Sequence, residues 1–279
     1  MLNEWITHLS TSCPQPHRRM GYLKELIAID RRHRRCLSSW TPHLERCRDL
    51  IIKATDHCND KNKAVVLGSG LLLDIPLSYL AQHFDDVVLV DVCHLRQTRQ
   101  MVKSFQNVRF LELDVSGIAD QLNHWLSGHQ NAPLPSPCID PDMLSGANYV
   151  ISSNLLAQLP LTPLAYLEQS APHIESMVRE GFARDIVDHH LSLLQSLDCP
   201  VTLITETFRL ISSDEKTLNK IDPLFGAPLL YEGEEWWWDI APRPEIDRNF
   251  DVRLAVRGIA NLNDAGHARF CRNTTLAAP

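Results

Sequence analysis

The 279-residue sequence lacks the features that mark membrane, secreted and metal-dependent proteins. No apolar run approaches the roughly 18 residues that a bilayer-spanning helix needs. The N-terminus has no basic region followed by an apolar stretch, so no secretory signal is expected. The eight cysteines lie far apart and include no CxxC pair, which argues against a disulfide framework. We therefore expect a reduced, cytoplasmic protein with no metal site and no membrane association.

Basic charge is scarce outside the N-terminal segment. Residues 1–62 carry 11 Lys and Arg against 7 Asp and Glu, whereas the other 217 residues carry 16 against 27. An acidic body is a poor platform for a phosphate backbone, so a nucleic-acid partner is not expected. The run RRHRR at 31–35 is either an anion patch or the solvated face of a helix, and we favour the helix face. The sequence leaves open whether the chain forms a homo-oligomer.

The first 62 residues show helical periodicity. Leu23, Leu26 and Ile27 fall near one face of a helix. Thr41 and Pro42 have the pattern of an N-cap and first-turn proline, which predicts that a second helix begins there. We expect an N-terminal helical cap over 1–62, followed by the main domain over 63–279.

From residue 64 onward, short apolar runs alternate with helical segments. The expected strands cover 64–69, 86–92, 107–115, 148–154 and 200–211, and the expected helices cover 71–84, 94–105, 116–128 and most of 155–198. Near-continuous apolar strands joined by helices predict a doubly wound, mostly parallel α/β sheet covered on both faces. Segments 234–242 and 249–262 have no helical period between them and predict a terminal antiparallel hairpin.

The first expected strand ends in Gly68-Ser69-Gly70, and Leu72 stands where a dinucleotide loop has its third glycine. In doubly wound sheets, ligands bind beyond the carboxyl ends of the strands, and glycine lets the backbone turn sharply there. Asp91 ends the second strand about twenty residues later. A carboxylate at that position can accept both hydroxyls of a ribose, the alternative being a solvated turn aspartate.

Polar residues also follow the third and fourth expected strands. Asp114 is placed to accept the exocyclic amine of adenine or to cap the next helix, a role for which Ser116 competes. Ser152, Ser153 and Asn154 follow the fourth strand and would line the same edge of the sheet, unless they only give a loop its polarity.

Together these segments resemble the class I S-adenosylmethionine-dependent methyltransferases. VVLGSG stands at the glycine motif, VVLVDV at the acidic second strand, RFLELDVS at the third motif and YVISSNLLAQLP at the fourth. The segments WWWDI and FDVRLAVRGI resemble the antiparallel closure of that family's sheet. Two positions depart from the family pattern: Val66 replaces the acidic residue often found before the glycine loop, and Leu72 replaces the third glycine.

The resemblance implies S-adenosylmethionine as cofactor and methyl transfer to an unidentified small-molecule acceptor. The cofactor contacts that it implies are Gly68, Ser69, Gly70, Asp91, Val92, Asp114, Val115, Asn154 and Leu155. A missing third glycine is more harmful to a pyrophosphate binder than to a sulfonium binder, because that glycine lets the helix pack close beneath the phosphates. Two alternatives remain: a non-catalytic binding or scaffold protein of the same fold, and a nicotinamide-dependent oxidoreductase.

A general base is needed only if the nucleophile keeps its proton at neutral pH. The candidates for this role are His189, His190 and Glu206, with His43 as a weaker one; each also has a packing or surface interpretation. The run WWW at 236–238 alternates faces in a strand, so at least one ring is expected in the core. Its functional interpretation is an aromatic wall for a cationic or planar substrate.

Overall fold

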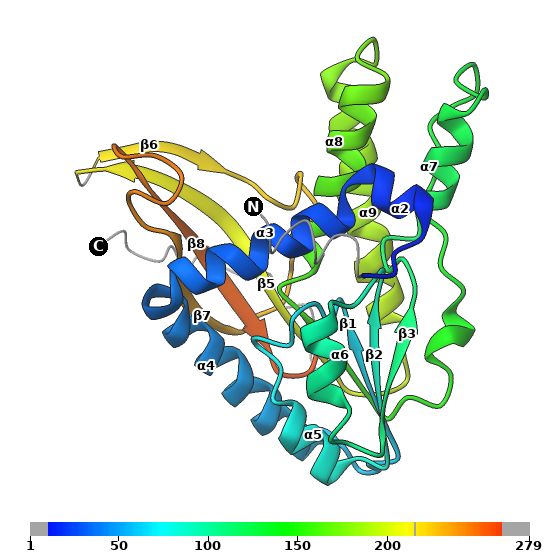
Figure 1. Ribbon diagram of the computed structural model, residues 1–279, viewed down its shortest axis with the longest axis vertical. Helices are drawn as coiled ribbons and strands as arrows, with labels where there is room; N and C mark the ends of the chain where they lie inside the picture. The colour runs from blue at the N-terminus through cyan, green and yellow to red at the C-terminus, as the bar shows by residue number, and fades with distance from the viewer. Residues whose placement is uncertain (1–10, 215, 264–279) are drawn as a thin grey trace.

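A computed structural model describes residues 11–214 and 216–263 (Figure 1). The helices are α2 (Gln15–Met20), α3 (Tyr22–Arg35), α4 (Leu37–Ala54), α5 (Leu77–His83), α6 (Arg96–Val102), α7 (Ala119–Leu126), α8 (Leu161–Ser170) and α9 (Ser176–Gln195), with short 3-10 turns η1 (Thr55–His57), η2 (Pro141–Leu144) and η3 (Leu156–Gln158). The strands are β1 (Lys63–Leu67), β2 (Asp86–Asp91), β3 (Val108–Glu112), β4 (Tyr149–Ser153), β5 (Val201–Ser213), β6 (Lys216–Ile221), β7 (Glu234–Ala241) and β8 (Asp251–Ile259). No helix in the described ranges is both long and apolar enough to cross a membrane.

The sheet has the strand order β3-β2-β1-β4-β5-β8-β7, with β6 paired to β5 off this path. Strands β1 to β5 are parallel to one another. Strand β8 runs antiparallel to both β5 and β7. The predicted doubly wound sheet and its terminal antiparallel hairpin are therefore confirmed. The order reverses between β1 and β4, so the carboxyl ends of these two strands flank the position where ligands bind in such sheets.

Alternation along the strands divides the core between two faces of the sheet. In β1, Val65 and Leu67 pack in one cluster with α7 and α9, represented by Leu122 and Ile186. Ala64 and Val66 face the other cluster, which contains α4, α5 and two rings of β7. Strands buried on both faces account for the uninterrupted apolar runs in the sequence.

The N-terminal helices occupy two different places around the sheet. Helix α4 packs against β7 on one face, where Trp40 Nε1 donates to the Ile240 carbonyl at 2.9 Å. Helices α2 and α3 instead cross above the carboxyl ends of the parallel strands (Figure 1). The division at residue 62 into a cap and a main domain stays a prediction, and α3 is the part of the segment that covers the strand ends.

Two expected helix starts are wrong. Helix α5 begins at Leu77, and residues 71–76 form a loop, because Leu72 has φ +59° and a left-handed residue cannot continue a right-handed helix. Asp74 consequently lies in this loop and not in a first helical turn. Helix α4 begins at Leu37, so Pro42 lies inside the helix and Thr41 does not cap it. The hydroxyl of Thr41 donates to the Leu37 carbonyl at 2.8 Å.

Candidate functional site

The loop after β1 turns sharply at three left-handed residues spaced two apart. Gly68 has φ +65°, Gly70 has φ +48° and Leu72 has φ +59°. A Cβ on Gly68 would lie 2.5 Å from Leu155 Cδ1, so glycine is required there for packing as well as for conformation. A Cβ on Gly70 would meet only the Gly68 carbonyl oxygen, at 3.8 Å, and would project into open space.

Asp91, at the end of β2, holds this loop in place. Its Oδ2 accepts the Gly70 backbone N–H at 2.7 Å, and its Oδ1 accepts the Val92 N–H at 2.7 Å. Burial raises the pKa of Asp91 to about 6, opposed by these amide hydrogen bonds. The carboxylate is ionised at neutral pH and retains lone pairs for further donors.

A small cavity of about 160 Å³ opens beside Asp91. Its lining includes eight of the nine expected cofactor residues: Gly68, Gly70, Asp91, Val92, Asp114, Val115, Asn154 and Leu155. Ser69, the ninth, lines a larger adjoining cavity, and its hydroxyl lies 3.0 Å from His94 Nε2. Tyr22 of α3 closes the small cavity from the N-terminal side. The structure therefore brings together residues that follow β1, β2, β3 and β4.

Asp114 caps the start of α7, which was the alternative to adenine binding. Its Oδ2 accepts the backbone N–H groups of Ile118 at 3.1 Å and Ala119 at 2.8 Å, where α7 begins. Its Oδ1 accepts both the backbone N–H and the hydroxyl of Ser116, at 2.9 and 2.6 Å. Asp114 rather than Ser116 thus satisfies the first amides of α7, which corrects the capping role expected of Ser116.

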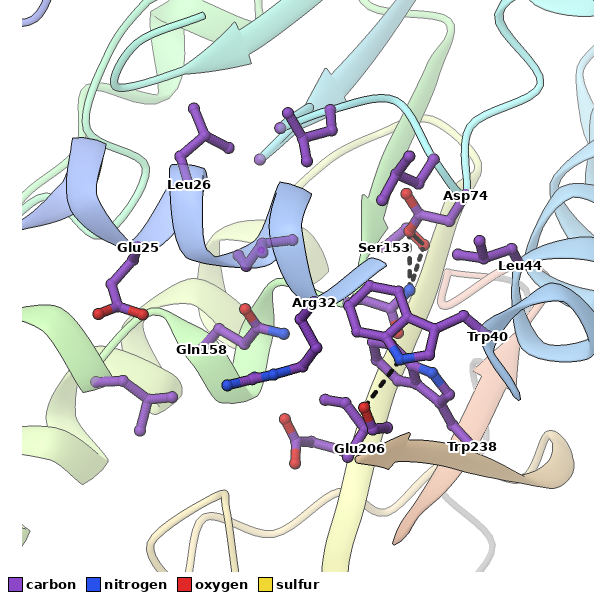
Figure 2. Close-up of a pocket in the computed structure, with 18 of the residues that line it drawn as sticks. Glu25, Leu26, Arg32, Trp40, Leu44, Asp74, Ser153, Gln158, Glu206 and Trp238 are labelled. Atoms are coloured by element: carbon purple, nitrogen blue, oxygen red, sulfur yellow. Dashed lines mark hydrogen bonds between the residues drawn. The ribbon is translucent and has the colours of Figure 1, made fainter. Parts of the chain in front are cut away.

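The larger cavity, of about 450 Å³, extends from the glycine loop toward β5 and β7. Figure 2 shows Asp74 and Ser153 toward one end, with Glu206, Trp238 and Trp40 toward the other. Gly70 and Asn154 line both cavities, so the two spaces adjoin.

An aromatic wall closes the far end of the larger cavity. Trp40 of α4 and Trp238 of β7 pack edge to face with ring centroids 4.9 Å apart. His43 stacks behind Trp238 at 3.9 Å, and its Nδ1 accepts the Trp236 indole N–H at 3.0 Å. Burial lowers the pKa of His43 to about 3. A neutral histidine held in this way supports the wall, and it does not line either cavity as the sequence analysis had considered.

The three tryptophans alternate as the strand geometry predicts. Trp236 and Trp238 are buried, which confirms that at least one ring belongs to the core. Trp237 faces the opposite side, where it packs edge to face against Phe208 and lies beneath the Arg253 guanidinium. The strand therefore offers one ring, Trp238, to the cavity.

Of the three expected catalytic residues, Glu206 alone lines a cavity. Its side chain is 5% exposed, and Oε2 lies 3.3 Å from the Arg209 guanidinium. Burial raises the pKa of Glu206, while Arg209 opposes that rise. His190 is buried on α9 with Nε2 3.0 Å from the Ser152 hydroxyl, and burial lowers its pKa to about 3. Burial also lowers the pKa of its neighbour His189.

Several residues of the larger cavity, including Asp74, Arg209 and Arg32, were not indicated by the sequence. Arg32 belongs to the RRHRR run, which we had favoured as a solvated helix face. The run indeed has exposed members, and Arg35 pairs with Glu245 at 2.6 Å. Arg32 lies 3.6 Å from the same carboxylate, and it differs from Arg35 in lining the cavity from α3 (Figure 2). Helical periodicity did not indicate which arginine of the run would point toward the strand ends.

The strand order, the antiparallel β8 and the glycine loop at the switch point define the class I methyltransferase fold. Solved structures similar to this chain include the N-methyltransferase NodS from Bradyrhizobium japonicum in complex with S-adenosyl-L-homocysteine (12% identity, covering 76% of this chain and 85% of that one, TM-score 0.35). Another is 1,6-didemethyltoxoflavin-N1-methyltransferase from Burkholderia thailandensis (13% identity, 84% and 89% covered, TM-score 0.36).

A third is precorrin 8W decarboxylase from Methanobacterium thermoautotrophicum (14% identity, 76% and 89% covered, TM-score 0.26). The chain matches no protein-family model and no curated protein. The assignment of the fold accordingly rests on the strand order of this chain itself.

Proposed function

We propose that this protein transfers a methyl group from S-adenosylmethionine to a small-molecule acceptor. The observation that carries the proposal is the pair of adjoining cavities at the carboxyl ends of the parallel strands, joined at Gly70 and Asn154. The smaller one, lined by the carboxylates of Asp91 and Asp114, would take part of the nucleoside, and the larger one has room for the rest of the cofactor and an acceptor.

The residues around the small cavity fit this cofactor. The carboxylate of Asp91 can accept ribose hydroxyls in addition to its two backbone amides. The carboxylate of Asp114, although it caps α7, also lines the cavity at the end where an adenine amine would lie. The absence of a side chain on Gly70 keeps the passage between the cavities open. We propose that all nine residues expected from the sequence contact the cofactor, because each of them lines one of the two cavities.

S-adenosylmethionine supplies an electrophilic methyl group on a sulfonium. The task left to the protein is to orient the acceptor and exclude water. The wall formed by Trp40 and Trp238 removes apolar surface of an acceptor from solvent. Glu206 is the residue that we propose to accept a proton from the acceptor, because burial raises its pKa and therefore its affinity for a proton, and its hydrogen bond from Arg209 uses only Oε2.

The shape of the site supports a small acceptor. Helix α3 crosses above the strand ends (Figure 1) and contributes Leu26, Ile29 and Arg32 to the lining of the larger cavity. Leu26 and Arg32 are labelled in Figure 2. A duplex could not approach the glycine loop beneath this helix without displacing it. The net charge of −7 also disfavours binding of nucleic acid.

Calorimetric titration with S-adenosylmethionine, S-adenosylhomocysteine and NAD tests the cofactor. We expect S-adenosylmethionine and S-adenosylhomocysteine to bind. Binding of NAD alone would contradict the proposal. Transfer is then tested by incubating the protein with a methyl-labelled cofactor and a metabolite extract of low molecular mass. Labelled product with wild-type protein, and much less with Glu206→Gln at equal cofactor affinity, is the expected result. Binding without transfer to any extract component favours a non-catalytic protein of the same fold.

A further inference from the structure

Arg32 enters the larger cavity from α3 with its hydrogen-bond donors uncommitted. Figure 2 shows its side chain extending from the helix toward the part of the cavity where Glu206 lies. The ion-pair partner of Arg32 within the described ranges is Glu245, whose Oε1 lies 3.6 Å from Nε. That distance is too long for a hydrogen bond, and Nε is buried without a hydrogen-bond partner. The guanidinium therefore keeps its donors for a ligand.

Glu245 does not neutralise Arg32, because it already serves another arginine. Arg35, one helical turn further along α3, donates to both oxygens of this carboxylate, at 2.8 and 2.6 Å. Such a bidentate pair has the geometry that guanidinium and carboxylate groups prefer, and it ties the end of α3 to the loop between β7 and β8. The three side chains together keep one positive charge. Since Arg35 is exposed at the surface, Arg32 is the member that brings this charge to the cavity.

A second arginine lines the same end of the cavity from β5. Arg209 is paired in the sheet with Leu254, and Leu254 is paired with Trp238 on its other side, so Arg209 and this ring stand in one row. Arg209 donates one nitrogen to Glu206 at 3.3 Å, and no other acceptor contacts its side chain among the described residues. The end of the cavity beside the aromatic wall thus contains two guanidinium groups and one carboxylate.

The other acidic side chains of the cavity lie away from this basic end. Asp74 follows the glycine loop, and Figure 2 shows it on the side of the cavity opposite Glu206. Glu25 lies two helical turns before Arg32 on α3 and also lines the small cavity, as does Asp91. S-adenosylmethionine carries a sulfonium, an ammonium and one carboxylate, so its net charge is positive and suits this acidic side. The basic end is complementary to a negatively charged group on the other reactant.

We propose that the methyl acceptor is an acidic small molecule whose carboxylate or phosphate group binds Arg32 and Arg209 while its apolar part packs against Trp238. The inference rests on the proposed function and names the class of its substrate. Each guanidinium presents N–H donors in a fork that matches oxygen anions, and here one comes from α3 and the other from β5. An acceptor anchored at this end extends toward the glycine loop, where the cofactor is proposed to bind.

Ion-exchange fractionation tests the charge of the acceptor. A metabolite extract of low molecular mass is passed over a strong anion-exchange resin at pH 7. The flow-through and the volatile-salt eluate are each incubated with wild-type protein and methyl-labelled S-adenosylmethionine. We expect labelled product from the eluate and none from the flow-through. If alkaline phosphatase abolishes labelling of the eluate, the anion is a phosphate, and if labelling persists, it is a carboxylate. An acceptor found in the flow-through would overturn the proposal.

Arg32→Gln tests the contact itself. The amount of eluate that gives half-maximal labelling should rise at least about tenfold, the scale of one charge-assisted hydrogen bond. The rate at saturating eluate should fall by a smaller factor, because the anion is held in the ground state and the transition state alike. Arg34→Gln is the matched control. It removes the same charge from an exposed position on α3, where Arg34 pairs with Asp30 and lines neither cavity, and it should behave like wild type.

The affinity for S-adenosylhomocysteine separates the acceptor from the cofactor. Calorimetry should give the same affinity for wild-type protein, Arg32→Gln and Arg34→Gln, which also reports that both variants are folded. A tenfold loss in Arg32→Gln would place this guanidinium on the cofactor carboxylate and overturn the proposal. Equal requirements for eluate in the two variants would overturn it as well. If wild-type protein binds S-adenosylhomocysteine but labels neither fraction, the proposed methyl transfer itself fails, and the inference fails with it.

Discussion

Gly70 and Asp91 are joined by a hydrogen bond of 2.7 Å from the glycine amide to the carboxylate Oδ2, which ties the loop after β1 to the end of β2. The bond fixes the shape of the loop before any ligand arrives. Gly70 also lines both cavities, and a Cβ added to it would meet only the Gly68 carbonyl oxygen, at 3.8 Å. Ligand affinity should therefore be sensitive to both residues, for different reasons.

Gly70→Ala is expected to weaken S-adenosylhomocysteine binding at least tenfold, because the added Cβ enters the passage. Part of any loss could come from backbone strain, since φ is +48° at this position. Gly146→Ala controls for the strain: Gly146 has φ +72° and open space around it, and it lines neither cavity. Each variant should lose about 1–2 kcal/mol of stability, and only Gly70→Ala should lose affinity in calorimetry. Equal affinities would contradict the placement of the cofactor.

The affinity for the cofactor should depend on pH through Asp91. Its pKa of about 6 means that it becomes protonated as the pH falls below that value, and the neutral acid accepts ribose hydroxyls less well. We expect the affinity for 5′-methylthioadenosine, which lacks the aminocarboxylate, to be flat from pH 7 to 8 and to fall below pH 6. An affinity that does not change between pH 7 and 5 would show that Asp91 does not contact the ligand.

The same shift affects stability in the opposite sense. The folded-state pKa of Asp91 lies above its ordinary value, so the folded state binds the proton more tightly than the unfolded chain does. The contribution of this group to stability is therefore largest below pH 4 and is lost as the pH rises through about 6. Above pH 6 the carboxylate is ionised and available to a ligand, and its burial makes the folded state less stable there.

Leu72→Gly should destabilise the protein although it relieves an unfavourable backbone conformation. A leucine at φ +59° costs about 1–2 kcal/mol relative to glycine. The buried Leu72 side chain, packed against the α4 face of the sheet, contributes about 2–5 kcal/mol. We expect a net loss of about 1–3 kcal/mol in urea unfolding. A more stable Leu72→Gly variant would mean that strain outweighs packing in this loop.

His43→Phe should make the free energy of unfolding depend less on pH between 7 and 5. His43 is neutral in the folded protein, with a pKa of about 3, but titrates near its usual 6.5 in the unfolded chain. Its contribution is present above pH 6.5 and falls as acid protonates the unfolded state, by about 2 kcal/mol between pH 7 and 5. The variant leaves Trp236 Nε1 without its acceptor and should cost about 1–3 kcal/mol at pH 7. Urea unfolding should show this cost shrinking at pH 5, and a cost independent of pH would contradict the neutral state of His43.

The sequence predicted the parallel strands and the residues that follow them because both depend on local pattern. Val65 to Leu67 form an uninterrupted apolar run, and Gly68 and Asp91 follow strands whose carboxyl ends must meet at one edge. The same spacing predicted that Asp91 lies beside the glycine loop. Strand β6 was missed because its side chains are exposed on both faces, so it carries no alternation of apolar and polar residues.

The walls of the larger cavity were harder to predict because they come from contacts between distant elements. Asp74 was expected in a helix, since the apolar residues before it suggested one, and its side chain is held by Ser153 at the end of β4 and by Asn154 directly after it. His190 was expected near the chemistry, but α9 turns it toward Ser152 beneath the sheet. Arg32 was indistinguishable in the sequence from its exposed neighbours. Each outcome was decided by tertiary packing that no local pattern encodes.

The aromatic wall joins α4 and β7, which are synthesised at different times because they lie far apart in the sequence. Trp236 donates to His43 across 193 residues, and Trp40 donates to Ile240 across 200. During synthesis, α4 leaves the ribosome long before β7, so its ring-bearing face has no partner while the central strands emerge. The end of the larger cavity that holds Trp40 and Trp238 is therefore completed after the small cavity. Under the proposed function, a nascent chain ending before β7 would already contain the residues for the nucleoside, but it would lack the wall that would shield the reaction from water.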